Sequence, residues 1–234
     1  MKILVAENYP NSPLGTVGEA LAECDAEIDI VVAHGGEPLP DDPNGYDGLV
    51  MLGGAQSALA DDDYPYLPAL TKLTRAFGDS GRAVLGICLG SQIIARAYGG
   101  RNGLDRPLEF GYRPVTPRPE AVDDPVLSAL TAPTPTFHWH KDTVELPDGA
   151  VHLASSEMTP YQAWRIGTNV YAMQFHFEAS TEVVADWSAR APEYILPYVP
   201  DWPERLPGEL ATNGAVADGF GLELSRRWVK MVGG

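Results

Sequence analysis

The stretch around Cys88 constrains the fold of this chain more than any other. Ala83–Ile87 is an apolar run with the length of a buried strand, and Gln92–Tyr98 carries apolar residues at helical spacing before a glycine pair. Cys88 lies between them, with Gly86 and Gly90 two residues away on either side. A side chain on a sharp strand-to-helix turn needs neighbours without a Cβ, because the backbone is strained and the helix passes close. The stretch therefore predicts a nucleophile elbow with a sulfur at its tip.

This position would also activate the thiol of Cys88. The N-terminus of a helix has unpaired N–H groups and the positive end of the helix dipole, and both favour a thiolate. The backbone N–H of Leu89 is placed to donate to an oxyanion. The alternative interpretation is a small buried cysteine at a tight turn, since free cysteine is often a core residue.

Composition bounds the class of protein. A chain of 234 residues, 44% hydrophobic and 21% charged, can form one large α/β domain, although two small domains are also compatible. No run approaches the roughly 18 apolar residues of a membrane helix, and the first residues lead directly into a strand, so we expect a cytoplasmic protein. A formal net charge of −16 argues against nucleic acid and anionic membranes as partners. The two cysteines cannot make a disulfide framework, and Cys24 is assigned no role.

Strands and helices alternate in the first half of the chain, which favours a parallel sheet. We expect strands at 2–6, 28–32, 47–52 and 83–87, and helices at 16–24, 67–77 and 92–98. The later part is β-rich: a proline-interrupted edge strand or excursion at 113–119 precedes strands at 136–142, 150–155, 161–166 and 170–177. Helices are expected at 181–189 and 222–229, whereas 191–218 is rich in proline, glycine and aspartate and gives no assignment.

A glycine pair, Gly53 and Gly54, follows the third predicted strand. In an open α/β sheet, ligands bind outside the carboxyl ends of the strands, and glycines there let backbone N–H groups approach a substrate oxygen. The same pair can also serve only to turn the chain, and the residues leave both interpretations open.

His176 and Glu178 supply the second half of the chemistry. On a strand, residues two apart point to one face, while Phe175 and Phe177 point to the other. A carboxylate so placed orients the imidazole and leaves its second nitrogen free to accept a proton from sulfur. Cys88, His176 and Glu178 would then be nucleophile, general base and orienting acid. The alternative is a surface pair of little energetic consequence.

His138 and His140 alternate along a predicted strand, and this spacing could suit a metal ion. Zinc sites need three or four ligands, however, and a third is not evident, so we predict no metal site. We also find no G-x-x-x-x-G-K-[ST] phosphate loop and predict no cofactor.

The two stretches together resemble class I (triad-type) glutamine amidotransferases. Residues 86–92, Gly-Ile-Cys-Leu-Gly-Ser-Gln, and 174–178, Gln-Phe-His-Phe-Glu, carry this resemblance, and their order and separation agree with it. Residues 109–112, 137–142 and 150–156 are similar to the stand-alone GMP-synthase-like group. The resemblance covers about residues 1–190 and implies a flavodoxin-like, three-layer α/β fold, with a mostly parallel central sheet flanked by helices and a small β-rich excursion. Residues 191–234 would be a C-terminal extension packed on the same domain.

The resemblance also implies a reaction. The Cys88 thiolate would attack the γ-carboxamide of glutamine or a γ-glutamyl compound, ammonia would leave, and water would clear the γ-glutamyl thioester. Gly54 and Leu89 would supply N–H groups to the oxyanion, Gln92 would contact the substrate, and His140 would line the pocket.

Three positions depart from the family pattern. Ala55 stands where a proline often follows the glycine pair, Phe177 where many members have proline, and Lys141 where glycine is frequent. The first implies a looser oxyanion loop and the third an altered pocket rim. None removes a catalytic group.

Three other hypotheses stay open. One is a γ-glutamyl peptidase or hydrolase acting on γ-glutamyl amides or isopeptides. Another is a low-activity regulatory or binding subunit of a synthetase complex. A cysteine version of the α/β-hydrolase fold fits less well, because its acid precedes its histidine. Fewer than 50 residues follow position 190, too few for an ATP-using domain. Either ammonia passes to another polypeptide, such as a separate synthetase subunit, or ammonia is not the product that matters.

Overall fold

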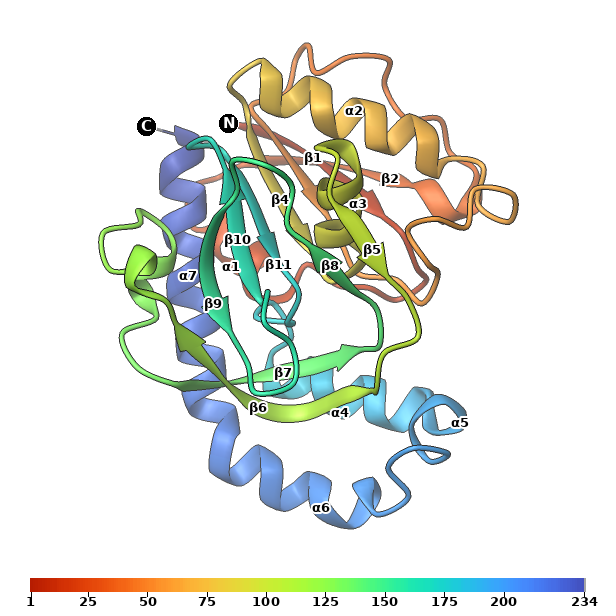
Figure 1. Ribbon diagram of the computed structural model, residues 1–234, viewed down its shortest axis with the longest axis vertical. Helices are drawn as coiled ribbons and strands as arrows, with labels where there is room; N and C mark the ends of the chain where they lie inside the picture. The colour runs from red at the N-terminus through yellow and green to blue at the C-terminus, as the bar shows by residue number, and fades with distance from the viewer. Residues whose placement is uncertain (234) are drawn as a thin grey trace.

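Nine strands form one continuous sheet in the computed structural model, which describes residues 1–233 (Figure 1). Their order across the sheet is β2-β1-β3-β4-β11-β10-β9-β6-β7. The bounds are β1 Lys2–Glu7, β2 Glu27–Val32, β3 Gly48–Met51, β4 Ala83–Ile87, β6 Glu109–Pro117, β7 Thr134–His140, β9 Val151–Ser155, β10 Ala163–Ile166 and β11 Val170–Met173. A separate two-stranded sheet pairs β5 (Arg101–Gly103) with β8 (Thr143–Glu145).

The first five strands in this order, from β2 to β11, are parallel. Every residue of β3, β4 and β11 is buried, as expected for strands of a parallel sheet that is covered on both faces. β4 lies between β3 and β11, so the segment that follows it emerges near the middle of the sheet. This arrangement places the elbow where the sequence predicts it.

Helices cover both faces of the parallel strands (Figure 1). On one face, Leu21 of α1 and Trp228 of α7 share a core with Val5, whereas on the other face Phe77 of α2 and Ile93 of α3 pack in a second core. The predicted three-layer α/β fold is confirmed. The helix bounds are α1 Gly15–Ala22, α2 Leu67–Asp79, α3 Leu89–Ala97, α4 Thr181–Arg190, α5 Pro192–Ile195, α6 Trp202–Glu209 and α7 Ala215–Gly233. Short 3-10 turns occupy Ala33–Gly35, Pro119–Ala121 and Leu127–Ala129, and a π-helical turn occupies Leu210–Gly214.

The β-rich excursion continues the same sheet, because β11, β10, β9, β6 and β7 pair antiparallel in turn. The edge-strand expectation for 113–119 is wrong in its placement, since β6 lies between β9 and β7. Only Thr116 and Pro117 of β6 pair with β9, so one side of the strand is unpaired along most of its length. Prolines are tolerated there for the same reason as at an edge.

Two other expectations differ from the structure. β11 ends at Met173 rather than at residue 177, and His176 makes only an isolated bridge with Phe137. The unassigned stretch 191–218 contains α5, α6 and the start of α7. Prolines at the first or second position of α5 and α6 fit helix starts, which explains why a proline-rich stretch can still be helical. The domain boundary at residue 190 stays a prediction.

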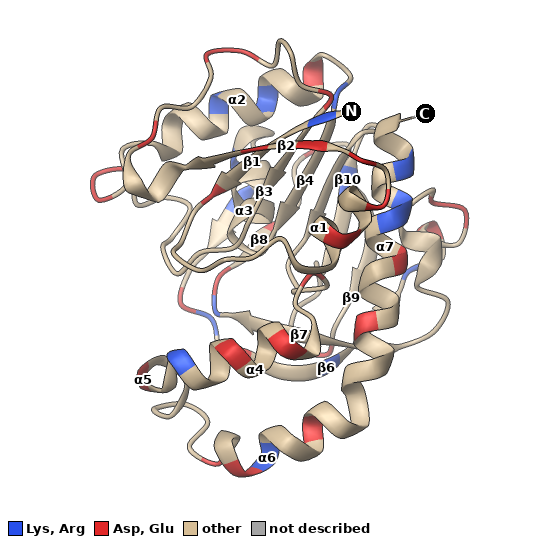
Figure 2. Cartoon of the chain, turned by 180° about the vertical axis from the view of Figure 1, so that it is seen from behind, with Lys and Arg blue, Asp and Glu red and all other residues tan. Residues whose placement is uncertain are grey.

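Within residues 1–233, no helix combines the length and apolar character needed to cross a bilayer. On the face shown in Figure 2, Lys and Arg residues are scattered among Asp and Glu residues without forming a continuous basic stripe. The expectation that nucleic acid is not a partner stays a prediction.

Candidate active site

Three adjacent parallel strands deliver the candidate residues to one edge of the sheet. Gly53 and Gly54 follow β3, Cys88 follows β4, and His176 comes three residues after β11. The carboxyl ends of parallel strands meet at the same edge, and the Cys88 N–H donates to the Met173 carbonyl at 2.8 Å. The long separation of Cys88 and His176 in sequence is therefore closed by strand pairing.

The elbow has the strained geometry that the glycine spacing predicts. Cys88 has a φ of 52°, which side chains rarely adopt. A Cβ on Gly86 would lie 2.5 Å from the backbone of Gly90, and a Cβ on Gly90 would lie 2.3 Å from the Met51 carbonyl oxygen. The prediction that Gly86 and Gly90 must lack a Cβ is confirmed, because a methyl group at either position would separate α3 from the sheet.

His176 and Glu178 form a buried hydrogen-bonded pair, as predicted. Glu178 Oε1 lies 2.7 Å from His176 Nδ1, so the carboxylate accepts from Nδ1–H and leaves Nε2 for other chemistry. Burial lowers the pKa of His176, but the charge of Glu178 and the contacts with Cys88 and Glu178 outweigh burial and raise this pKa to about 10. These surroundings therefore favour the protonated imidazole.

Both ends of the chain hold the segment that carries this pair. The Thr16 N–H in α1 donates to the Glu178 carbonyl at 3.0 Å, and the Thr16 hydroxyl to the Phe177 carbonyl at 3.2 Å. Ser225 in α7 hydrogen bonds to the same hydroxyl at 3.1 Å, and a Cβ on Gly221 would lie 2.1 Å from the Phe177 carbonyl oxygen. The His–Glu pair is thus fixed by backbone contacts to α1 and α7 as well as by the isolated bridge between His176 and Phe137.

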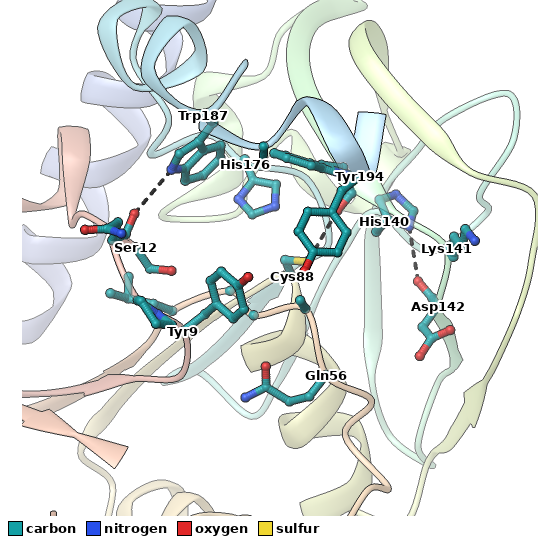
Figure 3. Close-up of a pocket in the computed structure, with 18 of the residues that line it drawn as sticks. Tyr9, Ser12, Gln56, Cys88, His140, Lys141, Asp142, His176, Trp187 and Tyr194 are labelled. Carbon is teal, nitrogen blue, oxygen red and sulfur yellow. Dashed lines mark hydrogen bonds between the residues drawn. The ribbon is translucent and has the colours of Figure 1, made fainter. Parts of the chain in front are cut away.

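A cavity of about 640 Å³ opens above Cys88. Six of the seven predicted site residues line it, namely Gly54, Cys88, Gln92, His140, His176 and Glu178. Figure 3 shows Cys88 near its centre, with His176 on one side and His140 on the other. Leu89 does not line the cavity, but it is the first residue of α3, where the backbone N–H has no intrahelical acceptor. A Cβ on Gly54 would lie 2.7 Å from the Leu89 side chain, so the glycine loop packs against the start of α3.

Gln92 and His140 are held in the cavity wall by the protein. The Gln92 side-chain amide donates to Gln174 Oε1 at 3.3 Å and to the Asp142 carbonyl at 3.4 Å. His140 Nδ1 lies 3.1 Å from the same carbonyl (Figure 3). Hydrogen bonds within the protein therefore orient both side chains beside the cavity.

Sequence reasoning missed the aromatic wall of the cavity. Its members come from four segments, namely the loop after β1, β7, α4, and α5 with the turn that follows it, and are Tyr9, Trp139, Trp187, Tyr194 and Tyr198. The Trp187 ring packs edge-on against His176 with centroids 5.2 Å apart, and its indole N–H donates to the Asn11 carbonyl at 3.3 Å. Isolated aromatic residues carry no spacing motif, so only the fold brings them together.

It also missed Glu109, which is buried against His140 at 3.3 Å. The two residues are opposite one another in the β6–β7 register. That register cannot be read from the sequence.

The fold has three layers, α/β/α, with a cysteine elbow after the central strand and a His–Glu pair after the neighbouring strand. The class I glutamine amidotransferases have this arrangement. Residues 14–185 match that family, Glutamine amidotransferase class-I, and the chain belongs to it.

Among curated proteins, a Salmonella typhimurium glutamine amidotransferase-like protein, YfeJ, is 34% identical over 64% of this chain and 64% of its own length. Gamma-glutamyl peptidase 5 of Arabidopsis thaliana is 32% identical over 65% of this chain and 62% of its own. The chain therefore spans slightly less than two thirds of these two relatives. One subunit of the glutamine-hydrolyzing GMP synthase of Methanosarcina mazei is 32% identical over 77% of this chain and 88% of its own.

The fold has close counterparts among solved structures. A glutamine amidotransferase from Methylobacillus flagellatus superimposes with a TM-score of 0.86 at 27% identity, covering 97% of this chain and 93% of its own. The resemblance to class I glutamine amidotransferases that the sequence indicates is therefore confirmed.

Proposed function

We propose that this protein is a cysteine-dependent amidohydrolase that cleaves the γ-carboxamide of glutamine, or of a γ-glutamyl compound, through a γ-glutamyl thioester. The observation that carries the proposal is the buried Glu178–His176 pair beside Cys88 at the edge of one cavity. Family membership supports amide hydrolysis in general.

In the proposed first step, the Cys88 sulfur attacks the γ-carbonyl carbon, and the π electrons of the C=O bond move onto the oxygen. The backbone N–H groups of Gly54 and Leu89 donate to this oxyanion. The imidazolium of His176 protonates the leaving nitrogen as the C–N bond breaks, so ammonia departs and a thioester remains.

In the second step, neutral His176 removes a proton from water as the water oxygen attacks the thioester carbonyl. The C–S bond then breaks, glutamate is released, and the proton on His176 again balances the thiolate. Glu178 keeps the imidazole oriented throughout, because its hydrogen bond to Nδ1 holds the ring in place.

The test is ammonia release from glutamine by the purified chain. Cys88→Ala should reduce the rate at least roughly 10³-fold, because the nucleophile is removed. Cys24→Ala is the matched control, since Cys24 is exposed and lies outside the cavity, and it should retain full activity. Equal ammonia release by Cys88→Ala and the unsubstituted chain would refute the proposal.

A second candidate is a γ-glutamyl hydrolase whose substrate carries a larger amine on the γ-carboxamide. A cavity of about 640 Å³ lies within the roughly 300–1,000 Å³ that suits drug-sized ligands, and its aromatic wall offers contacts that an ammonia leaving group does not use. The relative named gamma-glutamyl peptidase 5 also supports this candidate. A comparison of kcat/KM for glutamine and a γ-glutamyl dipeptide, whose leaving amine is not chemically activated, distinguishes the two: a higher value for the dipeptide favours the hydrolase.

If glutamine is the substrate, we propose that ammonia passes to a separate synthetase subunit, as the name of the Methanosarcina relative suggests. A thiol-reactive glutamine analogue tests whether the chain acts alone. Labelling of Cys88 in the isolated chain supports an autonomous enzyme. Labelling only after the synthetase partner is added indicates a chain with little activity of its own.

A further inference from the structure

Behind the wall of the cavity, β6 and β7 bring together Glu109, His138 and His140. Glu109 faces His140 in the β6–β7 register, and His138 lies two residues earlier on the same face of β7. All three side chains are buried. One ligand atom from each lies within 4.8 Å of the other two.

The hydrogen-bond pattern gives His140 a lone pair directed at Glu109. The Asp142 carbonyl, 3.1 Å from Nδ1, can only accept, so Nδ1 carries the hydrogen. In a neutral imidazole, Nε2 is then an acceptor, and it faces Glu109 Oε2 at 3.3 Å. Two acceptors in contact inside a protein require a cation or a proton between them.

His138 also faces the Glu109 carboxylate. Its Nε2 lies 3.0 Å from the Thr136 hydroxyl, and its Nδ1 lies 3.4 Å from the Gln162 amide nitrogen, whose two hydrogens have closer acceptors in Glu109 Oε2 at 2.9 Å and Ser156 Oγ at 3.0 Å. The 3.8 Å between Nδ1 and Glu109 Oε1 is too long for a hydrogen bond, and a neutral His138 that donates from Nε2 to Thr136 directs its Nδ1 lone pair at this oxygen. Among the described residues, neither Glu109 Oε1 nor His140 Nε2 has a hydrogen-bond partner.

We propose that Glu109, His138 and His140 bind a divalent transition metal ion of the zinc type. Imidazole nitrogen and carboxylate oxygen are zinc ligands, and tetrahedral sites commonly combine three protein ligands with water. Ligands roughly 2.0–2.2 Å from zinc in a tetrahedral site lie about 3.3–3.6 Å apart. Glu109 Oε2 lies 3.3 Å from His140 Nε2, and Glu109 Oε1 lies 3.8 Å from His138 Nδ1. With one ligand atom from each residue within 4.8 Å of the others, small side-chain shifts would close the three ligands around an ion. Because His140 lines the cavity, the ion and its water can enter from that side.

The surroundings already orient the three ligands. The Asp142 carbonyl holds the ring of His140, Thr136 holds that of His138, and the Gln162 amide donates to Glu109 Oε2 at 2.9 Å. Such outer hydrogen bonds fix tautomer and ring orientation in metal sites. The bound ion would join β6 to β7 next to the elbow, since the Trp139 carbonyl lies 3.9 Å from Cys88 Sγ. It would therefore stabilise this part of the wall.

The first test uses the full chain, stripped with a chelator and titrated with ZnCl₂ by calorimetry. We expect one equivalent to bind, and Co²⁺ in its place to give the visible absorption of a tetrahedral site. Glu109→Gln and His138→Gln should each weaken binding at least tenfold. His152→Gln, which alters a histidine outside the cluster, should leave binding unchanged, and so should Cys88→Ala.

The second test needs no substitution and therefore does not depend on whether the variants fold. X-ray absorption of the zinc-loaded chain should show nitrogen and oxygen ligands at about 2.0–2.1 Å, with imidazole scattering and no sulfur at about 2.3 Å. A sulfur ligand, or loss of binding in Cys88→Ala, would place the ion on Cys88 and overturn the proposal. Failure of the unsubstituted chain to bind zinc would also overturn it and would mean that a proton bridges Glu109 and His140.

Discussion

The parallel and antiparallel halves of the sheet build opposite walls of the same cavity by different means. In the parallel half, backbone geometry positions Cys88 and His176: both follow neighbouring strands, and the glycines beside Cys88 let α3 approach β3. In the antiparallel half, His140 is positioned by the Glu109 side chain across the β6–β7 pair and by the Asp142 carbonyl two residues along the chain. Substitutions in the wall that backbone geometry builds should reduce the activity of the enzyme abruptly. Substitutions in the wall that polar side chains build should first reduce the stability of the fold.

The largest expected effect in this comparison follows from Glu178→Gln. Loss of the carboxylate removes the main charge that raises the pKa of His176 to about 10, so the imidazolium is lost at a lower pH. We expect kcat to fall by roughly 10³–10⁴-fold, as for triad acids elsewhere. The alkaline limb of the kcat profile should also move to lower pH. An unchanged pH profile would show that Glu178 does not act on His176.

Glu178→Gln should also change how the free energy of unfolding depends on pH. A histidine whose pKa is raised in the folded state stabilises the fold fully below its unfolded pKa of about 6.5, and this contribution is lost as the pH rises towards 10. The free energy of unfolding of the unsubstituted chain should therefore fall between pH 6.5 and 10. In Glu178→Gln, measured by denaturant titration, this decline should be smaller.

Gly90→Ala tests the backbone wall directly. The added Cβ would lie 2.3 Å from the Met51 carbonyl oxygen, so α3 must move away from β3. We expect the free energy of unfolding to fall by roughly 1–3 kcal/mol, and the elbow to lose its geometry and with it most activity. Gly219→Ala is the matched control, because a Cβ there meets nothing within 4 Å in α7, and it should not destabilise the chain. A fully active, stable Gly90→Ala chain would contradict the tight packing of the elbow.

Gln162→Leu tests the side-chain wall. It removes the amide that donates to Glu109 Oε2 at 2.9 Å and leaves a buried carboxylate oxygen without that donor. The free energy of unfolding should fall by roughly 1–3 kcal/mol, while kcat changes less than tenfold. A large loss of kcat with unchanged stability would reverse the distinction between the two halves.

The smallest effect is expected at the cavity rim, where Tyr194 is 55% exposed. For γ-glutamyl-p-nitroanilide, Tyr194→Ala should raise KM by roughly three- to tenfold through lost aromatic contact. For glutamine, KM should stay the same because a small substrate does not reach the rim. Equal changes for both substrates would mean that the rim does not select the amine.

The same contrast explains how much the sequence could predict. The elbow, the His–Glu pair and the parallel strands follow from local rules: glycine spacing, alternation and buried apolar runs at known offsets. The third member of the His138–His140 cluster could not be found, because Glu109 reaches them through a strand register set by tertiary packing. The aromatic wall was missed because its residues share no spacing motif, and because Tyr194 and Tyr198 lie in a proline-rich stretch that indicates loop. Sequence therefore predicts the parts of the site that lie on one continuous segment better than those assembled between segments.

The hold of α1 and α7 on the backbone of residues 177 and 178 has a consequence for synthesis on the ribosome. A nascent chain that has reached only α4 already contains the cysteine, histidine and glutamate, yet it lacks the helix that seats the last two. The segment with His176 and Glu178 therefore gains its full set of backbone contacts only after α7 has been synthesised and has packed against it.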